Sequence, residues 1–182
     1  MAIIGTRNFT TVNIKQDTPV ESINNAEMLL QYAEIHSIRV IPIDVIGIAR
    51  LLNIEVIEKD FSAAPEISSK IFKDKNGGWV IEINKTQNEN RKRYAIAHNI
   101  GHFCLHKKDH EDEIFYRERD DTNKEECQAN DFAGKILIPE DDFLNRIRSG
   151  HDSIEELSEI YGVSSLAIRI RAKRVGVTGH GL

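Results

Sequence analysis

The spacing of the apolar residues changes twice along this chain, and this change restricts the fold to few classes. Helical spacing over residues 45–52 gives way to the alternation of short strands between 54 and 83, and helical spacing returns over 88–106. Asn76-Gly77-Gly78 suits a tight hairpin, so the last two strands are expected to pair antiparallel. The sequence therefore predicts an α+β fold in which helices surround a small antiparallel sheet.

Capping residues and prolines predict the other helices. Ser, Thr or Pro at the start of a helical pattern, and Gly or Pro after it, indicate where a helix begins and ends. The charge-rich stretch at residues 107–121 is instead predicted to be a solvated loop. The further helices are expected at residues 18–36, 42–52, 122–138, 139–148, 153–161 and 164–174.

Length and charge narrow the class of protein. A chain of 182 residues can bury a core without disulfides, and we expect an arm at 1–17, a main domain at 18–148 and a helical segment at 149–182. The sequence has no signal peptide or long apolar run, which predicts a cytoplasmic protein without membrane contact. Its net charge of -5 argues against a chain-wide nucleic-acid surface.

Two histidines on the predicted helix at 88–106 indicate a metal site. His98 and His102 are four residues apart, so both imidazoles lie on one side of a helix, about 6 Å apart along its axis. Zinc binds imidazole nitrogen, and a catalytic zinc site takes three protein ligands and keeps a fourth position open. Glu126 is the expected third ligand, because it begins a helix face that continues through two small alanines and would let the helices approach closely.

Two longer runs make this reading specific. They are RYAIAHNIGHFCLH at residues 93–106 and ECQANDFAGKILIP at residues 126–139. They closely resemble the AHELGHxxLH and ExxANxFAxxLLxP motifs of the ImmA/IrrE family of metallopeptidases, and the likeness extends over residues 20–177. The resemblance implies a zincin-like active-site helix in a metallopeptidase domain at 18–148. It also implies that His98, His102 and Glu126 bind Zn²⁺, with Glu125 as a less favoured third ligand.

The same resemblance implies a function. Members of this family are zinc-dependent endopeptidases, hydrolases that cleave a helix-turn-helix repressor and so derepress its genes. The length of the chain matches the short type found in prophages and mobile elements. We therefore expect a helix-turn-helix repressor or another protein as the substrate, although the residues that bind it cannot be named from the sequence.

Asn99 departs from the family pattern. The residue after the first histidine of an HExxH motif is a glutamate that takes a proton from the attacking water, and asparagine has no titratable oxygen. Three explanations are open: an introduced substitution, a catalytically silent relative that binds a repressor or toxin partner, or a base supplied by His106 or Tyr116. In each case the chain is expected to bind metal, and unless a substitute base acts, it is expected as an enzyme to be inactive or strongly impaired.

Other polar residues near the motif have two readings each. Asn130, one turn after Glu126, could orient a ligand imidazole from outside the metal's own ligand set, or form an ordinary hydrogen bond between helices. His106 could touch the metal or orient a ligand, and the simpler reading is a histidine favoured by the helix dipole. Cys104 and Cys127 are predicted to pack rather than to bind metal.

The C-terminal segment supports a hypothesis of a different class. A helix, the turn at Gly162 and a second helix with a serine cap have the outline of a helix-turn-helix, and the second helix carries Arg169, Arg171, Lys173 and Arg174. A DNA-binding regulator would place that helix in the major groove. Apolar residues surround the basic ones, so we interpret 149–182 as a packing and partner-docking appendage, and direct nucleic-acid binding is not expected.

Overall fold

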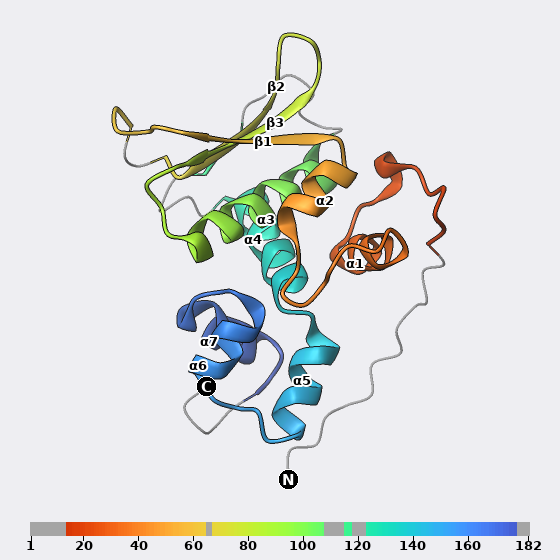
Figure 1. Cartoon of the computed structure of the whole chain (residues 1–182), viewed down its shortest axis with the longest axis vertical. Coiled ribbons are helices and arrows are strands. Elements are labelled where there is room, and N and C mark those ends of the chain that lie inside the picture. Colours follow the sequence, from red (N-terminus) through yellow and green to blue (C-terminus); the bar gives the residue numbers. More distant parts are fainter. Residues whose placement is uncertain (1–13, 65–66, 108–114, 118–122, 178–182) are drawn as a thin grey trace.

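A computed structural model describes residues 14–64, 67–107, 115–117 and 123–177, and the arm predicted at 1–17 lies mostly outside them. The predicted α+β class is confirmed (Figure 1). In chain order the elements are a 3-10 helix η1 (Val20–Ser22), α1 (Ala26–Ile35), α2 (Val45–Leu51), β1 (Ile54–Lys59), β2 (Ser69–Lys73), β3 (Trp79–Asn84), α3 (Glu89–His106), β4 (Phe115–Arg117), α4 (Lys124–Leu137), α5 (Glu140–Arg148), α6 (Ile154–Tyr161) and α7 (Ser165–Arg174).

The sheet is mixed, which corrects the prediction of a wholly antiparallel one. Its strand order is β1-β3-β2-β4, and β2 pairs antiparallel with both β3 and β4, whereas β1 pairs parallel with β3. The β2–β3 hairpin is as expected. Strand β3 lies between β1 and β2. It runs in the same direction as β1, so these two strands pair parallel.

Three helix starts differ from the prediction because another residue is the cap. Helix α2 begins at Val45 instead of Pro42, since Asp44 accepts a hydrogen bond from the Gly47 amide. Asn25 accepts a hydrogen bond from the Met28 amide, so α1 begins after it, and the Thr18-Pro19 segment precedes only the short η1. Asn123 likewise accepts from the Glu126 amide at the start of α4, in place of Thr122. Asparagine is a stronger N-cap residue than threonine, in agreement with the starts of α1 and α4. Within the stretch predicted to be a loop, β4 pairs with β2, and residues 108–114 and 118–122 lie outside the described residues.

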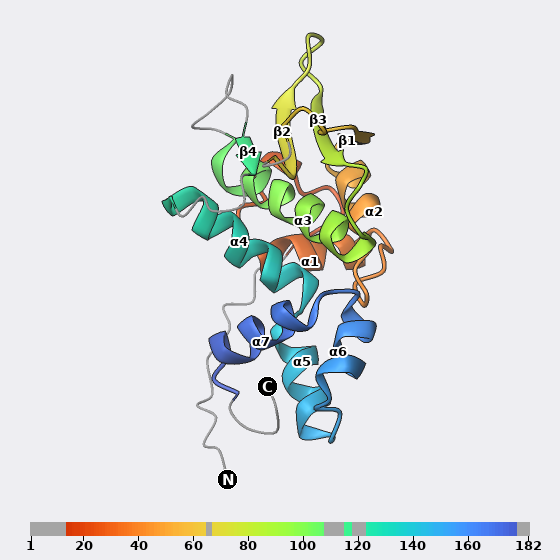
Figure 2. The ribbon, with the colours of Figure 1, turned by 90° about the vertical axis from the view of Figure 1, so that its left-hand side faces the viewer.

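Helix α3 lies between the sheet and α4 (Figures 1 and 2). Asn88 caps it, and from Ala95 to Cys104 every residue is buried, whichever side of the helix it occupies. A helix buried on all sides must be covered on more than one face, here by β2 and β3 and by α4. The two predicted metal-binding histidines are therefore at the centre of the molecule.

The C-terminal segment folds against α3 and α4. Arg93 of α3 donates hydrogen bonds to the carbonyls of Gly162 (3.0 Å) and Tyr161 (3.3 Å), where the chain turns between α6 and α7. Gly162 has φ +60°, a conformation that glycine adopts at little cost, and it ends α6. Arg171 is buried and donates from Nε to the Ile138 carbonyl at 2.9 Å. Among the described helices, none is both long and apolar enough to cross a bilayer.

The two cysteines occupy different environments. The packing role is confirmed for Cys104 on α3, where burial raises the pKa of the thiol to about 12, and is wrong for Cys127, which is exposed on α4. Because the thiolate is the reactive form, we expect a disulfide reagent at about pH 8 to modify Cys127 quickly and Cys104 only after unfolding. Absorbance of the released thiolate measures both steps. Two fast thiols in the folded protein would contradict the buried position of Cys104.

Candidate metal site

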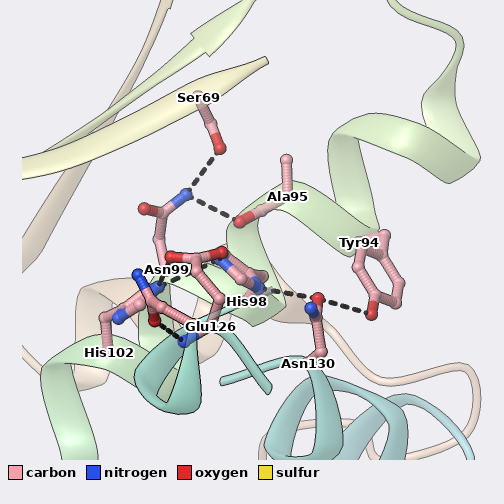
Figure 3. Close-up of polar contacts among 9 residues, drawn as sticks. Ser69, Tyr94, Ala95, His98, Asn99, His102, Glu126 and Asn130 are labelled. Atoms are coloured by element: carbon pink, nitrogen blue, oxygen red, sulfur yellow. Dashed lines mark hydrogen bonds and ion pairs between the residues drawn. The ribbon is translucent and has the colours of Figure 1, made fainter. Parts of the chain in front are cut away.

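Helices α3 and α4 bring His98, His102 and Glu126 together (Figure 3). The His102 Nε2 atom lies 2.8 Å from Glu126 Oε1, and His98 Nε2 lies 3.1 Å from Glu126 Oε2. The two Nε2 atoms are 3.0 Å apart, and all three residues are buried. Four donor atoms from two helices thus converge on one point inside the protein, and the group could hold a metal ion.

The closeness of the two helices depends on Gly101. A Cβ atom at Gly101 would lie 3.1 Å from both the Cα and the carbonyl oxygen of Ala129, which is tighter than ordinary van der Waals contact. Ala129 and Ala133 are fully buried on the face of α4 that begins with Glu126, as the sequence indicated. Small residues on both sides therefore let the Glu126 carboxylate reach the two imidazoles.

The imidazole nitrogens and carboxylate oxygens of this group would repel one another unless a proton or a cation lay between them. His98 Nδ1 faces Asn130 Oδ1 at 3.1 Å and donates to this acceptor, which leaves the Nε2 atom of the neutral ring with a lone pair directed at Glu126. A lone pair beside a carboxylate oxygen is repulsive unless a proton or a metal ion lies between them. Burial raises the pKa of Glu126, but when the His102 and His98 rings are protonated, their hydrogen bonds and positive charge outweigh it and lower that pKa to about 2. The carboxylate is therefore charged, as metal binding requires.

Asn130 of α4 forms a further contact between α4 and α3 at this site. Its Oδ1 atom accepts hydrogen bonds from the Tyr94 hydroxyl at 3.0 Å and from His98 Nδ1 (Figure 3). An oxygen acceptor on the far nitrogen fixes the tautomer and the ring orientation of an imidazole, which is the usual support for a metal-binding histidine. The bond to His98 is the contact that the orienting role requires and the bond to Tyr94 is one between helices, so the role of Asn130 stays a prediction. The only signal for Tyr94 in the sequence was its place one turn before His98.

Asn99 is held on the sheet side of α3. Its Nδ2 atom donates to the Ser69 hydroxyl and to the Ala95 carbonyl, each at 2.8 Å. The Ala95 carbonyl can only accept, so it fixes which end of the amide points toward it. Within the described residues, the buried Oδ1 atom has no hydrogen-bond partner. Asn99 thus follows His98 directly in the chain, its amide nitrogen is held by Ser69 and Ala95, and its side chain offers an unused acceptor.

Ser69 is a residue that the sequence analysis missed. It begins β2, and the alternation along that strand puts it on the same buried face as Ile71. That alternation was the one available signal, because only the fold shows that the face meets α3.

The remaining predicted residues lie around the group. His106 is buried one turn after His102, with 5.6 Å between the ring centroids, and it is not one of the converging ligands. Glu125 is half-buried and also stands outside the group. The backbone of Tyr116 pairs with Lys70 in the ladder between β4 and β2.

Comparison with known families agrees with this geometry. The profile of the Peptidase M78 family, described as the IrrE N-terminal-like domain, matches residues 49–173, which include α3, α4 and the three converging residues. A comparison with curated proteins gives no match. The match covers more than half of the chain and bears out the resemblance seen in the two motifs. The chain therefore belongs to the IrrE N-terminal-like family of metallopeptidases.

Proposed function

We propose that this protein is a zinc-dependent endopeptidase of the ImmA/IrrE type, or a close derivative of one, in which His98, His102 and Glu126 hold the metal. The observation that carries the proposal is the convergence of these buried residues, two imidazoles and one carboxylate, which is the number and type of protein ligands that a catalytic zinc site takes. Bound there, zinc would polarise the carbonyl of a peptide bond and make water a stronger nucleophile at neutral pH.

The residues around the ligands would orient and shield them. Asn130 and Tyr94 hold His98 so that its Nε2 lone pair faces Glu126. Burial excludes bulk water and strengthens each electrostatic contact. Asn99 stands where the family has a glutamate, and its amide is fixed by Ser69 and Ala95 without being able to accept a proton. We infer that the chain keeps the binding functions of the family and cleaves slowly.

The substrate we propose is a helix-turn-helix repressor, cleaved in the cytoplasm to derepress a prophage or mobile element. Membership of the family supports a protein substrate. If Asn99 abolishes cleavage, the alternative is a silent relative that binds a repressor or toxin partner. One experiment separates the two: zinc-loaded chain is incubated with the repressor encoded beside its gene. Fragments of defined mass support the peptidase, an intact stable complex supports the silent relative, and neither overturns both.

A DNA-binding regulator is the other candidate, because α6, Gly162 and α7 have the outline of a helix-turn-helix. Two of the four cations on α7 are already engaged within the chain. Arg171 is buried against the Ile138 carbonyl, with Glu140 3.5 Å away, and Arg174 pairs with Asp131 at 2.7 Å. A recognition helix would need its cations for phosphates and base edges.

We therefore expect the double variant Arg169→Ala, Lys173→Ala to leave duplex DNA affinity unchanged. These two residues are exposed, so the substitutions should not disturb the fold. A mobility-shift titration at low and physiological salt is the measurement. Tight, salt-sensitive and sequence-selective binding that disappears in the double variant would favour the regulator instead.

A further inference from the structure

A groove of about 850 Å³ lies between the first turns of α3, the second half of α4, and α7. We propose that it binds the segment of the polypeptide substrate next to the bond to be cleaved, and that this segment carries aliphatic side chains and a carboxylate. The inference rests on the proposed function and adds the direction in which the substrate leaves the metal site. It also assigns a task to the helix-turn-helix-like segment, since α7 forms one wall of the groove.

The groove borders the residues that position His98. Tyr94 and Asn130 both line it, and these are the two residues that hold His98 in place. A segment lying along the groove would therefore contact Tyr94 or Asn130, and Asn130 in turn contacts the proposed ligand His98. In Figure 2, α7 runs below α4, beside the end of α4 that is far from Glu126.

Gly134, in the groove wall formed by α4, is the second observation. A glycine inside a helix costs about 1 kcal/mol relative to alanine, so its position calls for a reason. At Gly101 the reason is internal, because a Cβ atom would meet Ala129. At Gly134 a Cβ atom would meet nothing within 4 Å among the described residues. The missing side chain instead leaves the backbone of α4 open toward the groove, where another chain could approach closely.

The groove walls indicate the chemistry of the occupant. Leu166 and Ile170 are one turn apart on α7, and they are 65% and 47% exposed, unusually open for large aliphatic residues. Both line the groove, so apolar side chains of a partner would bury them. On the opposite wall Arg91 is exposed and forms no ion pair within the described ranges. Its guanidinium suits a carboxylate and would repel a basic segment.

A polypeptide fits these walls better than a nucleic acid does. Phosphates would require several unengaged cations, whereas Arg171 and Arg174, which also line the groove, are paired with Glu140 and Asp131. The exposed aliphatic pair on α7 has no use in a phosphate site. Within this groove the second helix of the helix-turn-helix outline faces the peptidase body rather than a duplex.

The test is a peptide selection followed by measured affinities. A random phage-displayed library of 12-residue peptides is selected on the immobilised full chain in the presence of a chelator, so that binding needs neither metal nor cleavage. Fluorescence anisotropy then compares the selected peptides on the unchanged chain, Gly134→Ala and Gly134→Trp. We expect affinity about threefold weaker for the alanine variant, whose methyl group limits the close approach, and at least about tenfold weaker for tryptophan, which fills the groove. Arg91→Gln should cost acidic peptides about threefold at low salt.

Each outcome decides the proposal. Peptides that bind Gly134→Trp as tightly as Gly134→Ala would overturn it, as would a failure to enrich any peptide over an unrelated control protein. Displacement of the peptides by random-sequence duplex DNA would assign the groove to nucleic acid instead. If Gly134→Trp does not fold, the double variant Leu166→Ser, Ile170→Ser makes the same comparison at exposed positions. Loss of metal binding or of cleavage would refute the proposed function without changing these affinities, so the two failures are distinguishable.

Discussion

Replacing Asn99 with glutamate is expected to raise the rate of repressor cleavage by at least about 100-fold, the gain that a positioned general base provides. Glutamate adds a proton acceptor next to His98 and leaves the three proposed ligands His98, His102 and Glu126 unchanged. The Ser69 hydroxyl, which now accepts from Asn99, can rotate and donate to the new carboxylate. The initial cleavage rate of zinc-loaded protein is the measurement.

Asn99→Gln is the matched control for this experiment. Glutamine has the length of glutamate but no titratable oxygen, so it should remain as slow as the Asn99 form while binding the same amount of zinc. A glutamate variant that binds zinc and repressor yet cuts nothing would make a dedicated binding role the better account. An Asn99 form that already cuts as fast would show that the base lies elsewhere, and His106 and Tyr116 would be the next positions to replace.

Replacing Glu126 with glutamine is expected to weaken zinc binding by at least about 100-fold, because removing a direct ligand should cost more than the tenfold to hundredfold typical of its outer partners. The neighbouring substitution Glu125→Gln is a matched control, since it removes the same charge from a half-buried residue outside the converging group. Competition with a chromophoric chelator measures both affinities. Equal losses in the two variants, or a larger loss for Glu125→Gln, would place the third ligand elsewhere.

The sequence predicted the helices of the site more accurately than the sheet. Caps such as Asn88 and Ser153, and the turn at Gly162, act within a few residues of the element they define, so the pattern contains most of what determines them. Strand order depends instead on contacts between distant segments. Nothing in the alternation of residues 54–59 shows that β3, rather than β2, will lie beside it. The strand β4 was missed for the same reason, since its pairing partner is β2.

The candidate site shows the same difference between features that depend on neighbouring residues and features that depend on distant ones. The spacing of His98 and His102 on one helix was sufficient to place both imidazoles on one side, and the motif resemblance supplied Glu126. Ser69 and Tyr94 could not be assigned, because their contacts with Asn99 and Asn130 form only when the sheet and α4 pack against α3. A single sequence does not identify the residues that contact a site from a different helix or strand.

The backbone contact at Gly101 has a consequence for which ions the site can accept. Zinc takes carboxylate oxygen at about 2.0 to 2.2 Å, whereas calcium requires about 2.3 to 2.6 Å. The separation of α3 and α4 sets where the Glu126 oxygens stand relative to the imidazoles, and that separation is fixed one turn away, where Ala129 rests on Gly101. A change of a few tenths of an ångström in this spacing is as large as the difference between the zinc–oxygen and calcium–oxygen distances. We therefore expect that Gly101, which has no side chain to hold the helices apart, favours a small cation such as zinc over calcium.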